Sequence, residues 1–252
     1  MINLFDIKGK KAIVTGATRG LGKGMAEALL ESGCEVAAIG SSDGIFDTVK
    51  NWQELGYKAF SIKADLSIKE ENYRAFSEAL KLLGGVDILV CGAGVISRFP
   101  SEEFPICEWE KTINVNLTST FIMCQEASKE MIKKGYGKII TISSMCSYFG
   151  GQTVPAYSAS KGAVMPLTRA LANDWAGKGI NVNSIAPGYM DTDMTEGIRT
   201  NPDRFSDITK RIPMGRWGTP DDMKGITIFL SSRASDYLSG AIIPVDGGYL
   251  SK

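Results

Sequence analysis

Tyr157 and Lys161 are the pair of residues whose types and spacing are best suited to chemistry in this sequence. Because they are four residues apart, a helix would place them on the same face, one turn from each other. A free tyrosine has a pKa of about 10 and is a poor base at neutral pH. An ammonium within about 4–6 Å favours the phenolate and lowers that pKa. The pair is therefore a candidate general acid and base, although ordinary solvent-exposed helices carry the same spacing.

The sequence contains no histidine, and this narrows the chemistry further. Ser-His-Asp and Cys-His catalysis need an imidazole, as do the common histidine metal sites. The five cysteines are scattered and form no CxxC pair, so we predict neither a disulfide framework nor a cysteine metal site. Proton transfer near pH 7 must then come from tyrosine, lysine or carboxylates, and no metal is expected.

The composition is that of a globular protein, with 252 residues, 44% of them hydrophobic, and 28 basic against 28 acidic residues. Balanced charge gives no electrostatic reason to expect nucleic acid or an anionic membrane as a partner. No apolar run reaches the roughly 18 residues of a membrane span. Residues 1–11 lack the basic, apolar and small-residue order of a signal peptide. We expect a cytoplasmic protein.

A glycine-rich turn follows the first predicted strand, which covers residues 11–15. A helical pattern through Met25 and Leu29 comes directly after the turn. Glycines allow close backbone approach, and a helix N-terminus offers its N–H groups to a pyrophosphate. Strand, turn and helix form the context that a dinucleotide-binding loop requires. The loop residues predicted to bind a dinucleotide are Gly16, Thr18, Arg19, Gly20, Leu21 and Gly22.

The spacing of this loop, Thr15-Gly16-x-x-x-Gly20-x-Gly22, resembles the short-chain dehydrogenase/reductase family, and the resemblance covers essentially the whole chain. Strand-like and helical segments alternate, without an internal repeat or a linker. We therefore predict one α/β domain over residues 1–252, with a Rossmann-type, doubly wound, mainly parallel sheet of order 3-2-1-4-5-6-7 and helices on both faces. The predicted strands are 11–15, 35–39, 59–62, 86–90, 137–142, 180–185 and 241–245.

The resemblance implies reversible hydride transfer between a nicotinamide and a secondary alcohol or ketone. Ser144 lies thirteen residues before Tyr157, which is the family's spacing, and alternation turns Ser143 to the opposite side. Asn116, in a long helix expected over 107–133, matches an asparagine that bends the helix and holds a water. In the implied roles, Ser144 polarises the substrate oxygen and Tyr157 exchanges the proton. Lys161 lowers the tyrosine pKa and holds the nicotinamide ribose, and Asn116 completes the relay.

The family's cofactor contacts fall on further positions of the chain. Asp65 stands where the family places an aspartate against the adenine, and Ser67 is expected to cap the next helix and leave Asp65 free. Where most relatives have Asn-Asn-Ala-Gly, this chain has Cys91-Gly92-Ala93-Gly94, so both asparagines are missing. Beyond the glycine loop, the expected cofactor contacts are Ser41, Asp65, Leu66, Gly92, Ala93, Gly94, Tyr157, Lys161, Pro187, Gly188 and Thr192.

The cofactor preference between NAD(H) and NADP(H) stays open. A carboxylate just after the second strand would hydrogen-bond the 2′-hydroxyl of NAD and repel the 2′-phosphate of NADP. This chain has Gly40-Ser41-Ser42 there, and Asp43 comes later. The hydroxyl residues, with Arg19 nearby, slightly favour NADP. The resembled sugar-acid enzymes mostly prefer NAD.

The substrate is suggested by three segments, 154–157, 186–190 and 211–220, which look most like sugar-acid dehydrogenases of the deoxygluconate or gluconate type. A guanidinium can bind a carboxylate in a bidentate way. Arg98 is the main candidate for that role, and Arg211 and Arg216 are weaker ones. One alternative is a 3-oxoacyl-thioester reductase. Another is a non-catalytic dinucleotide-binding sensor, against which the intact set of Asn116, Ser144, Tyr157 and Lys161 argues.

Three further features concern the shape of the molecule. Residues 189–217 break the α/β rhythm and are expected to form a mobile substrate lid. Pro166 cannot donate to the carbonyl of Gly162 and should bend the helix just past Lys161. By resemblance, the chain is expected to form a homo-oligomer, a dimer or a tetramer, through the helices at 107–133 and 155–177.

Overall fold

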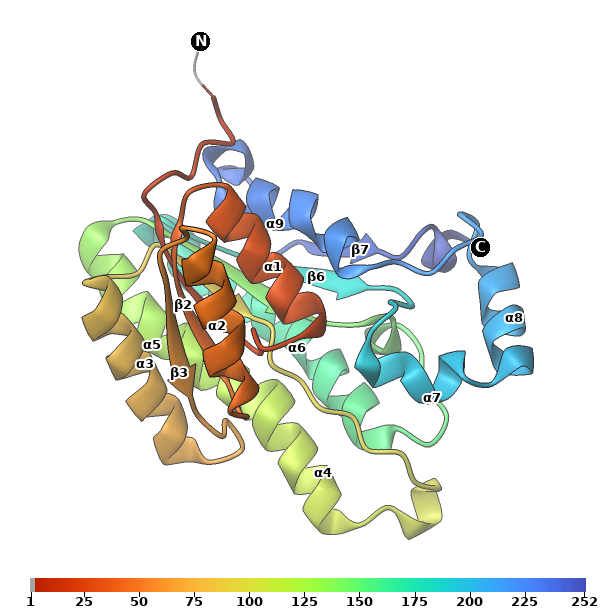
Figure 1. Cartoon of the computed structure of the whole chain (residues 1–252). Coiled ribbons are helices and arrows are strands. Elements are labelled where there is room, and N and C mark those ends of the chain that lie inside the picture. Colours follow the sequence, from red (N-terminus) through yellow and green to blue (C-terminus); the bar gives the residue numbers. More distant parts are fainter. Residues whose placement is uncertain (1–2) are drawn as a thin grey trace.

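A computed structural model describes residues 3–252 and contains one seven-stranded parallel sheet (Figure 1). The strand order, β3-β2-β1-β4-β5-β6-β7, confirms the predicted Rossmann-type topology. Met1 and Ile2, part of the segment used to argue against a signal peptide, lie outside the described residues. The strands are β1 (Lys11–Thr15), β2 (Glu35–Gly40), β3 (Ala59–Lys63), β4 (Ile88–Cys91), β5 (Gly137–Ile142), β6 (Ile180–Pro187) and β7 (Ile242–Val245).

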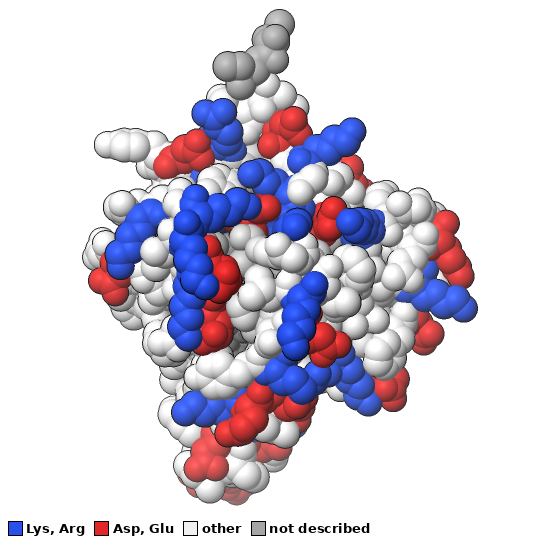
Figure 2. Space-filling model, turned by 90° about the vertical axis from the view of Figure 1, so that its left-hand side faces the viewer, with Lys and Arg blue, Asp and Glu red and all other residues white. Residues whose placement is uncertain are grey.

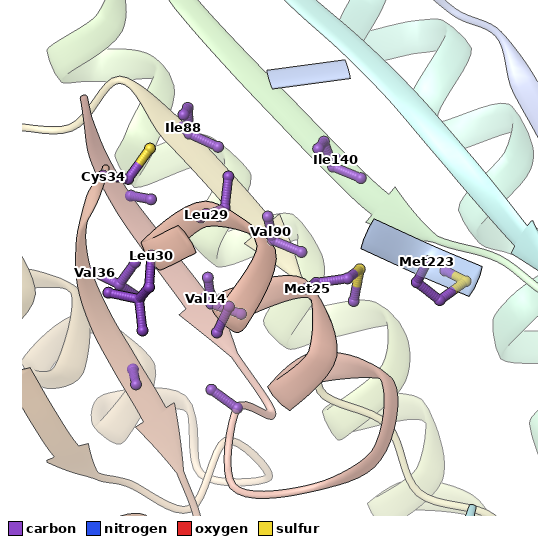
Figure 3. Packing of buried hydrophobic residues seen from close by; sticks show 14 of the residues in the cluster. Val14, Met25, Leu29, Leu30, Cys34, Val36, Ile88, Val90, Ile140 and Met223 are labelled. Carbon is purple, nitrogen blue, oxygen red and sulfur yellow. The ribbon is translucent and has the colours of Figure 1, made fainter. Parts of the chain in front are cut away.

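Helices cover both faces of the sheet because successive strand residues point to opposite sides. On β1, Val14 belongs to the core under one face and Ile13 to the core under the other. Figure 3 shows α1 packing on the first face, with Met25, Leu29 and Leu30 against the strands. The first face carries α1 (Gly20–Glu31), α2 (Gly44–Glu54) and α9 (Lys224–Ser231), and the second carries α3 (Lys69–Leu83), α5 (Ser119–Lys134) and α6 (Pro155–Trp175).

The long helix expected over 107–133 is interrupted in the structure. It consists of α4 (Ile106–Ile113), a π-helical turn (Asn114–Thr118) and α5. Single π turns inside α-helices are frequent at functional sites, and this one contains Asn116. Helix α6 remains α-helical through Pro166.

The segment predicted as a lid departs from the alternation of strands and helices. It holds a 3₁₀ turn (Asp193–Thr195), α7 (Glu196–Arg199) and α8 (Pro202–Arg211), which extend away from the sheet beyond the end of β6 (Figure 1). A small separate apolar cluster lies beneath it, formed by Met145, Ile198, Ile212, Trp217 and Tyr249. The lid thus has packing of its own, apart from the two main cores.

Acidic and basic side chains alternate on the face shown in Figure 2. Several acidic and basic residues pair with a neighbour on the same helix, such as Lys133 with Glu130 and Arg74 with Glu71 and Glu78. No described helix combines the length and apolar character needed to cross a membrane.

Candidate active site

The glycine loop leaves the carboxyl end of β1 and is packed too tightly for side chains. A Cβ on Gly16 would lie 2.7 Å from the backbone of Ala93, and one on Gly22 would lie 2.1 Å from the Gly16 carbonyl oxygen. Gly16 and Gly20 also have positive φ angles, of 70° and 56°, which other residues rarely adopt. The loop therefore brings bare backbone and the start of α1 to the sheet edge, as a pyrophosphate requires.

The end of β2 adjoins this loop and bears no carboxylate. The Oγ1 atom of Thr18 is buried without a hydrogen-bond partner, and a Cβ on Gly40 would lie 2.1 Å from it. Ser41 is exposed, while Asp43 forms an ion pair with Lys63 at 2.7 Å. The unpartnered Thr18 hydroxyl, in contact with the glycine backbone, fits a bound dinucleotide. The exposed Ser41 and the already paired Asp43 suit a 2′-phosphate.

Two expected cofactor contacts have protein partners in the structure. Arg19 pairs with Asp193 at 3.0 Å, which links the glycine loop to the lid. The expectation that Ser67 caps the next helix and leaves Asp65 free is wrong. Ser67 instead donates from its N–H and its hydroxyl to Asp65 Oδ1, at 2.9 and 2.7 Å, and the residue before α3 is Ile68. The carboxylate is tied into a local turn because a short aspartate reaches the backbone two residues on.

The turn after β4 keeps its shape although both asparagines of the family pattern are missing. The Thr15 hydroxyl accepts the Ala93 N–H at 3.1 Å and so joins β1 to β4. Cys91 is buried, with its sulfur 3.8 Å from that of Cys124. A Cβ on Gly92 would lie 2.7 Å from the Thr15 carbonyl oxygen, so only glycine fits there.

Asn116 is fully buried and joins three parts of the site. Its Oδ1 accepts the Val95 N–H at 2.8 Å, and its Nδ2 donates to the Val95 carbonyl and the Ser160 hydroxyl, both at 3.0 Å. Ser160 in turn donates to the Tyr157 carbonyl oxygen at 2.8 Å. The side chain thereby fixes the irregular segment after β4 against the tyrosine helix.

Ser144 lies two residues beyond the end of β5, at the edge where parallel sheets bind ligands. Its Oγ accepts the Cys146 N–H at 3.1 Å, and its N–H donates to the Ser147 hydroxyl at 3.1 Å. Ser147 donates onward to the Lys161 carbonyl oxygen at 2.6 Å. Ser143 is turned away, as predicted, because its hydroxyl donates to Ile185 at 3.1 Å.

Tyr157 and Lys161 lie on one face of α6, with the ammonium 6.0 Å from the centre of the tyrosine ring. Burial raises the pKa of Tyr157 to about 12, and the Ser144 hydrogen bond and the Arg98 charge only partly oppose it. This direction is opposite to the lowered tyrosine pKa that the resemblance implied. The cause is desolvation, which disfavours the phenolate more than the neighbouring groups stabilise it.

Lys161 is itself 4% exposed, and burial lowers its pKa to about 8. Its Nζ donates to the Ile142 carbonyl oxygen at 2.7 Å, so the ammonium points to the end of β5. A Cβ on Gly94 would lie 3.7 Å from Nζ, which shows that the backbone of the turn after β4 passes close to the lysine. A lysine whose pKa lies near neutral pH and a protonated tyrosine therefore lie together at this edge of the sheet.

The residues expected at the nicotinamide end lie around the same edge. Pro187 ends β6, and the Gly188 N–H donates to Val245 at 2.9 Å. A Cβ on Gly20 would lie 3.6 Å from the Thr192 side chain, so the start of the lid reaches the glycine loop. Leu66, expected at the adenine, is buried in the second core together with Ala75 and Phe76 of α3.

The three candidate arginines have different surroundings. Arg98 is exposed and forms no ion pair within the described residues; partial burial, and after it the charge of Arg204, lowers the pKa of Arg98. The other two candidates are engaged elsewhere. Arg216 holds Asp222 with two bonds of 2.8 and 2.7 Å, and Arg211 stacks 4.7 Å above the ring of Tyr249.

Sequence reasoning did not identify Ser147 and Ser160, which brace the site. Ser147 stands three residues after Ser144, the spacing of a capping box, and that pattern could have been noticed. Ser160 lies between Tyr157 and Lys161, and its hydroxyl accepts a hydrogen bond from Asn116, a residue of the π turn. In residues 3–252, no group of three His, Cys, Asp or Glu side chains is arranged to hold a metal ion.

Comparisons with known proteins agree with this geometry. A family profile described as enoyl-(acyl carrier protein) reductase matches residues 16–250. A 2-dehydro-3-deoxy-D-gluconate 5-dehydrogenase of Bacillus subtilis is 46% identical over 248 residues, which is 98% of this chain and 97% of the relative.

Two solved structures are also similar over nearly the whole chain. One is described as a candidate NAD(P)-dependent gluconate 5-dehydrogenase of Beutenbergia cavernae with bound NADP (TM-score 0.96, 41% identity, covering 99% of this chain and 100% of that one). The other is a gluconate 5-dehydrogenase of Burkholderia cenocepacia in complex with NADP and tartrate (TM-score 0.94, 34% identity, covering 99% and 98%).

Proposed function

We propose that this chain, which belongs to the short-chain dehydrogenase/reductase family, transfers hydride between NAD(P)(H) and a secondary alcohol or ketone of a sugar acid, of the deoxygluconate or gluconate type. The observation that carries the proposal is the placement of Ser144, Tyr157 and Lys161 at the sheet edge beside a side-chain-free glycine loop. Its substrate class rests on whole-length similarity to enzymes named for these compounds.

The protein's part in the reaction is to position the substrate and move one proton. A bound nicotinamide would supply or accept the hydride. Ser144 holds the substrate oxygen, and Tyr157 gives its proton to that oxygen when a ketone is reduced. A tyrosine pKa of about 12 keeps the proton in place until the oxygen becomes basic.

Lys161 supports this transfer from the same helix. One Nζ–H is used by Ile142, which leaves donors for the cofactor ribose and for water that resupplies Tyr157. The side-chain donors of Asn116 are committed to Val95 and Ser160, so its side chain holds the site together. The water relay at Asn116 stays a prediction.

The cofactor contacts expected from the sequence are part of the proposal. Gly16, Gly20, Gly22 and the start of α1 would hold the pyrophosphate, and Gly92 to Gly94 would lie along the cofactor. Ser41 would meet the adenosine ribose, with Asp65 and Leu66 at the adenine and Gly188 and Thr192 at the nicotinamide. NAD and NADP both remain candidates, although the two solved structures cited above contain NADP.

Two wider expectations complete the proposal. We place the chain in the cytoplasm, where its five free cysteines would suit a reducing compartment. We also propose a homo-oligomer through α4, α5 and α6, because Ile106, Trp109 and Phe121 leave apolar side chains exposed along α4 and α5. The segment 189–217 would act as the lid of each subunit.

A substrate panel tests the proposed function. NADH and NADPH oxidation should be followed separately with keto-sugar acids, with their uncharged ketose analogues and with an acetoacetyl thioester. The proposal predicts turnover of at least one keto-sugar acid. Activity confined to the thioester would support the reductase alternative suggested by the family profile's description. Tight cofactor binding without turnover of any ketone would support the sensor.

A further inference from the structure

We propose that a cavity at the edge of the sheet where the strands begin binds a small phosphorylated molecule. The cavity has a volume of about 620 Å³, within the range of about 300–1,000 Å³ that is usual for small-molecule sites. We call it the lysine cavity, because five lysines line it: Lys8, Lys10, Lys11, Lys133 and Lys134. The proposal does not depend on the oxidoreductase activity proposed above.

The lysine cavity lies where three segments of the chain meet. Residues 8–11 lead into β1, residues 84–87 join α3 to β4, and the last turn of α5 completes the lining. Because all the strands are parallel, this edge of the sheet is opposite the one that carries the glycine loop and Tyr157. A ligand in the lysine cavity would therefore leave the cofactor and substrate sites free.

The two carboxylates that line the cavity already have partners. The buried side chain of Asp87 pairs with Lys134 and accepts the Lys11 N–H at 3.0 Å. Glu130 accepts a hydrogen bond from Lys133 at 2.7 Å. Lys133 and Lys134 also stand in the last turn of α5, where the partial negative charge of the helix end favours cations. The acidic groups of the cavity and two of its lysines thus neutralise one another.

The other three lysines, Lys8, Lys10 and Lys11, keep uncompensated charges. Among residues 3–252, none of their ammonium groups has a carboxylate oxygen within ion-pair distance, unlike the two lysines of α5. Lys10 Nζ instead lies 4.2 Å from the centre of the Tyr136 ring. Three like charges within four residues of sequence repel one another, and a ligand with several negative charges would relieve this repulsion.

The turn beside Lys11 leaves room for such a ligand. It consists of Gly84 and Gly85, whose φ angles of 66° and 151° are rarely adopted by other residues. A Cβ on Gly84 would lie 3.4 Å from Lys11 Nζ, and one on Gly85 would lie 3.8 Å from Lys11 Cδ. Bare backbone therefore faces the lysine side chain, and no neighbouring side chain occupies that space.

The chemistry of the lining favours phosphate groups on a small molecule. An ammonium is a compact charge with three donors and binds phosphate as a point charge, whereas the planar guanidinium of arginine matches a carboxylate. No arginine of the described chain lines the cavity. The positive excess is also local and concave, because the whole chain carries 28 basic and 28 acidic residues. A nucleic acid or a membrane would need a broad basic surface instead.

Calorimetric titration of inorganic triphosphate into the protein saturated with NADPH tests the proposal. NADPH occupies the glycine loop, so saturable binding of triphosphate reports a second site. At about 0.15 M salt, charges more than about 8 Å apart are largely screened, which suppresses diffuse attraction. We expect one site per chain with a Kd of about 1 mM or tighter. In Lys8→Gln/Lys11→Gln the Kd should rise at least about tenfold, because two charged hydrogen bonds are lost.

Lys50→Gln/Lys69→Gln is the matched control, since it removes the same charge from two exposed lysines outside the cavity. Its Kd should stay within about twofold of the wild type. Lys8→Arg/Lys11→Arg keeps both charges and should retain binding, which separates charge from damage to the fold. Titrations of ATP and of a sugar bisphosphate then show which molecule carries the phosphates: the tighter binder identifies a nucleotide or a sugar, and both results support the site.

Three results would overturn the proposal and leave the proposed function intact. The first is the absence of saturable triphosphate binding to the wild type. The second is equal weakening in the two glutamine double variants, which would indicate diffuse attraction. The third is competition between triphosphate and NADPH, which would place the anion in the glycine loop. Failure of the wild type to reduce any ketone would refute the proposed function and leave this site standing.

Discussion

Replacing Asn116 by alanine should separate bracing of the site from general stability. The substitution removes one acceptor and two donors, and it leaves the N–H and carbonyl groups of Val95 without their partners. A buried unsatisfied polar group costs about 1–3 kcal/mol. Because Val95 is only partly buried and water can reach part of it, we expect the free energy of unfolding to fall by about 2–4 kcal/mol.

The catalytic effect should be larger than this loss implies. Val95 lies between Gly94, which adjoins Lys161, and Arg98, so a shift of this segment disturbs the substrate site from both ends. Misplacement by about 1 Å can cost on the order of 10²-fold in rate. We therefore expect kcat to fall by about 10²-fold in Asn116→Ala, measured at a temperature where the variant is folded.

Asn183→Ala is the matched control for this experiment. Asn183 is 1% exposed, donates to the Leu238 carbonyl at 2.9 Å and accepts the Ala241 N–H at 3.0 Å, which are bonds of the same kind between β6 and the turn before β7. Its loss should cost a similar free energy of unfolding and leave kcat within about threefold. Thermal denaturation measures the loss of stability in each variant, and steady-state kinetics measure kcat. Equal kcat values for the two variants would refute the bracing role of Asn116.

Two other predictions concern the cofactor and the lysine. Ser41→Asp should reduce kcat/KM with NADP relative to NAD by at least about tenfold, because the carboxylate would repel a 2′-phosphate; an unchanged ratio would place the ribose elsewhere. The pKa of Lys161, about 8, lies below the 10.5 of an exposed lysine. The unfolded chain then binds more protons between pH 8 and 10.5, so the free energy of unfolding rises with pH in that window. Relative to Lys161→Met, the wild type should gain up to about 3 kcal/mol there in cofactor-free denaturation titrations; parallel curves would contradict the burial of the ammonium.

Much of the fold could be predicted because the pattern is local. Each parallel strand is a short apolar run followed by a turn, so the sheet order was predicted correctly and each strand was placed to within two residues at either end. The glycine loop was equally clear, since only glycine fits where its backbone touches Ala93. The choice of Ser144 over Ser143 followed from the alternation of side chains in a strand.

The errors arose where contacts between distant segments decide the outcome. The pKa of Tyr157 depends on how deeply α6 is buried, which a four-residue spacing does not reveal. Asp65 was expected to be free, but the turn draws Ser67 onto it. Ser160 gains its bracing role only through the hydrogen bond that it accepts from Asn116, more than forty residues earlier in the chain.

The most direct test of the central claim is Tyr157→Phe, which removes only the hydroxyl that exchanges the proton. We predict that the dissociation constant for NAD(P)H, measured by fluorescence titration, changes by less than about threefold. The single-turnover rate with a keto-sugar acid should fall by several orders of magnitude, because no other group of the site can replace that proton donor at the substrate oxygen. A variant that binds cofactor and retains most of its turnover would contradict the account.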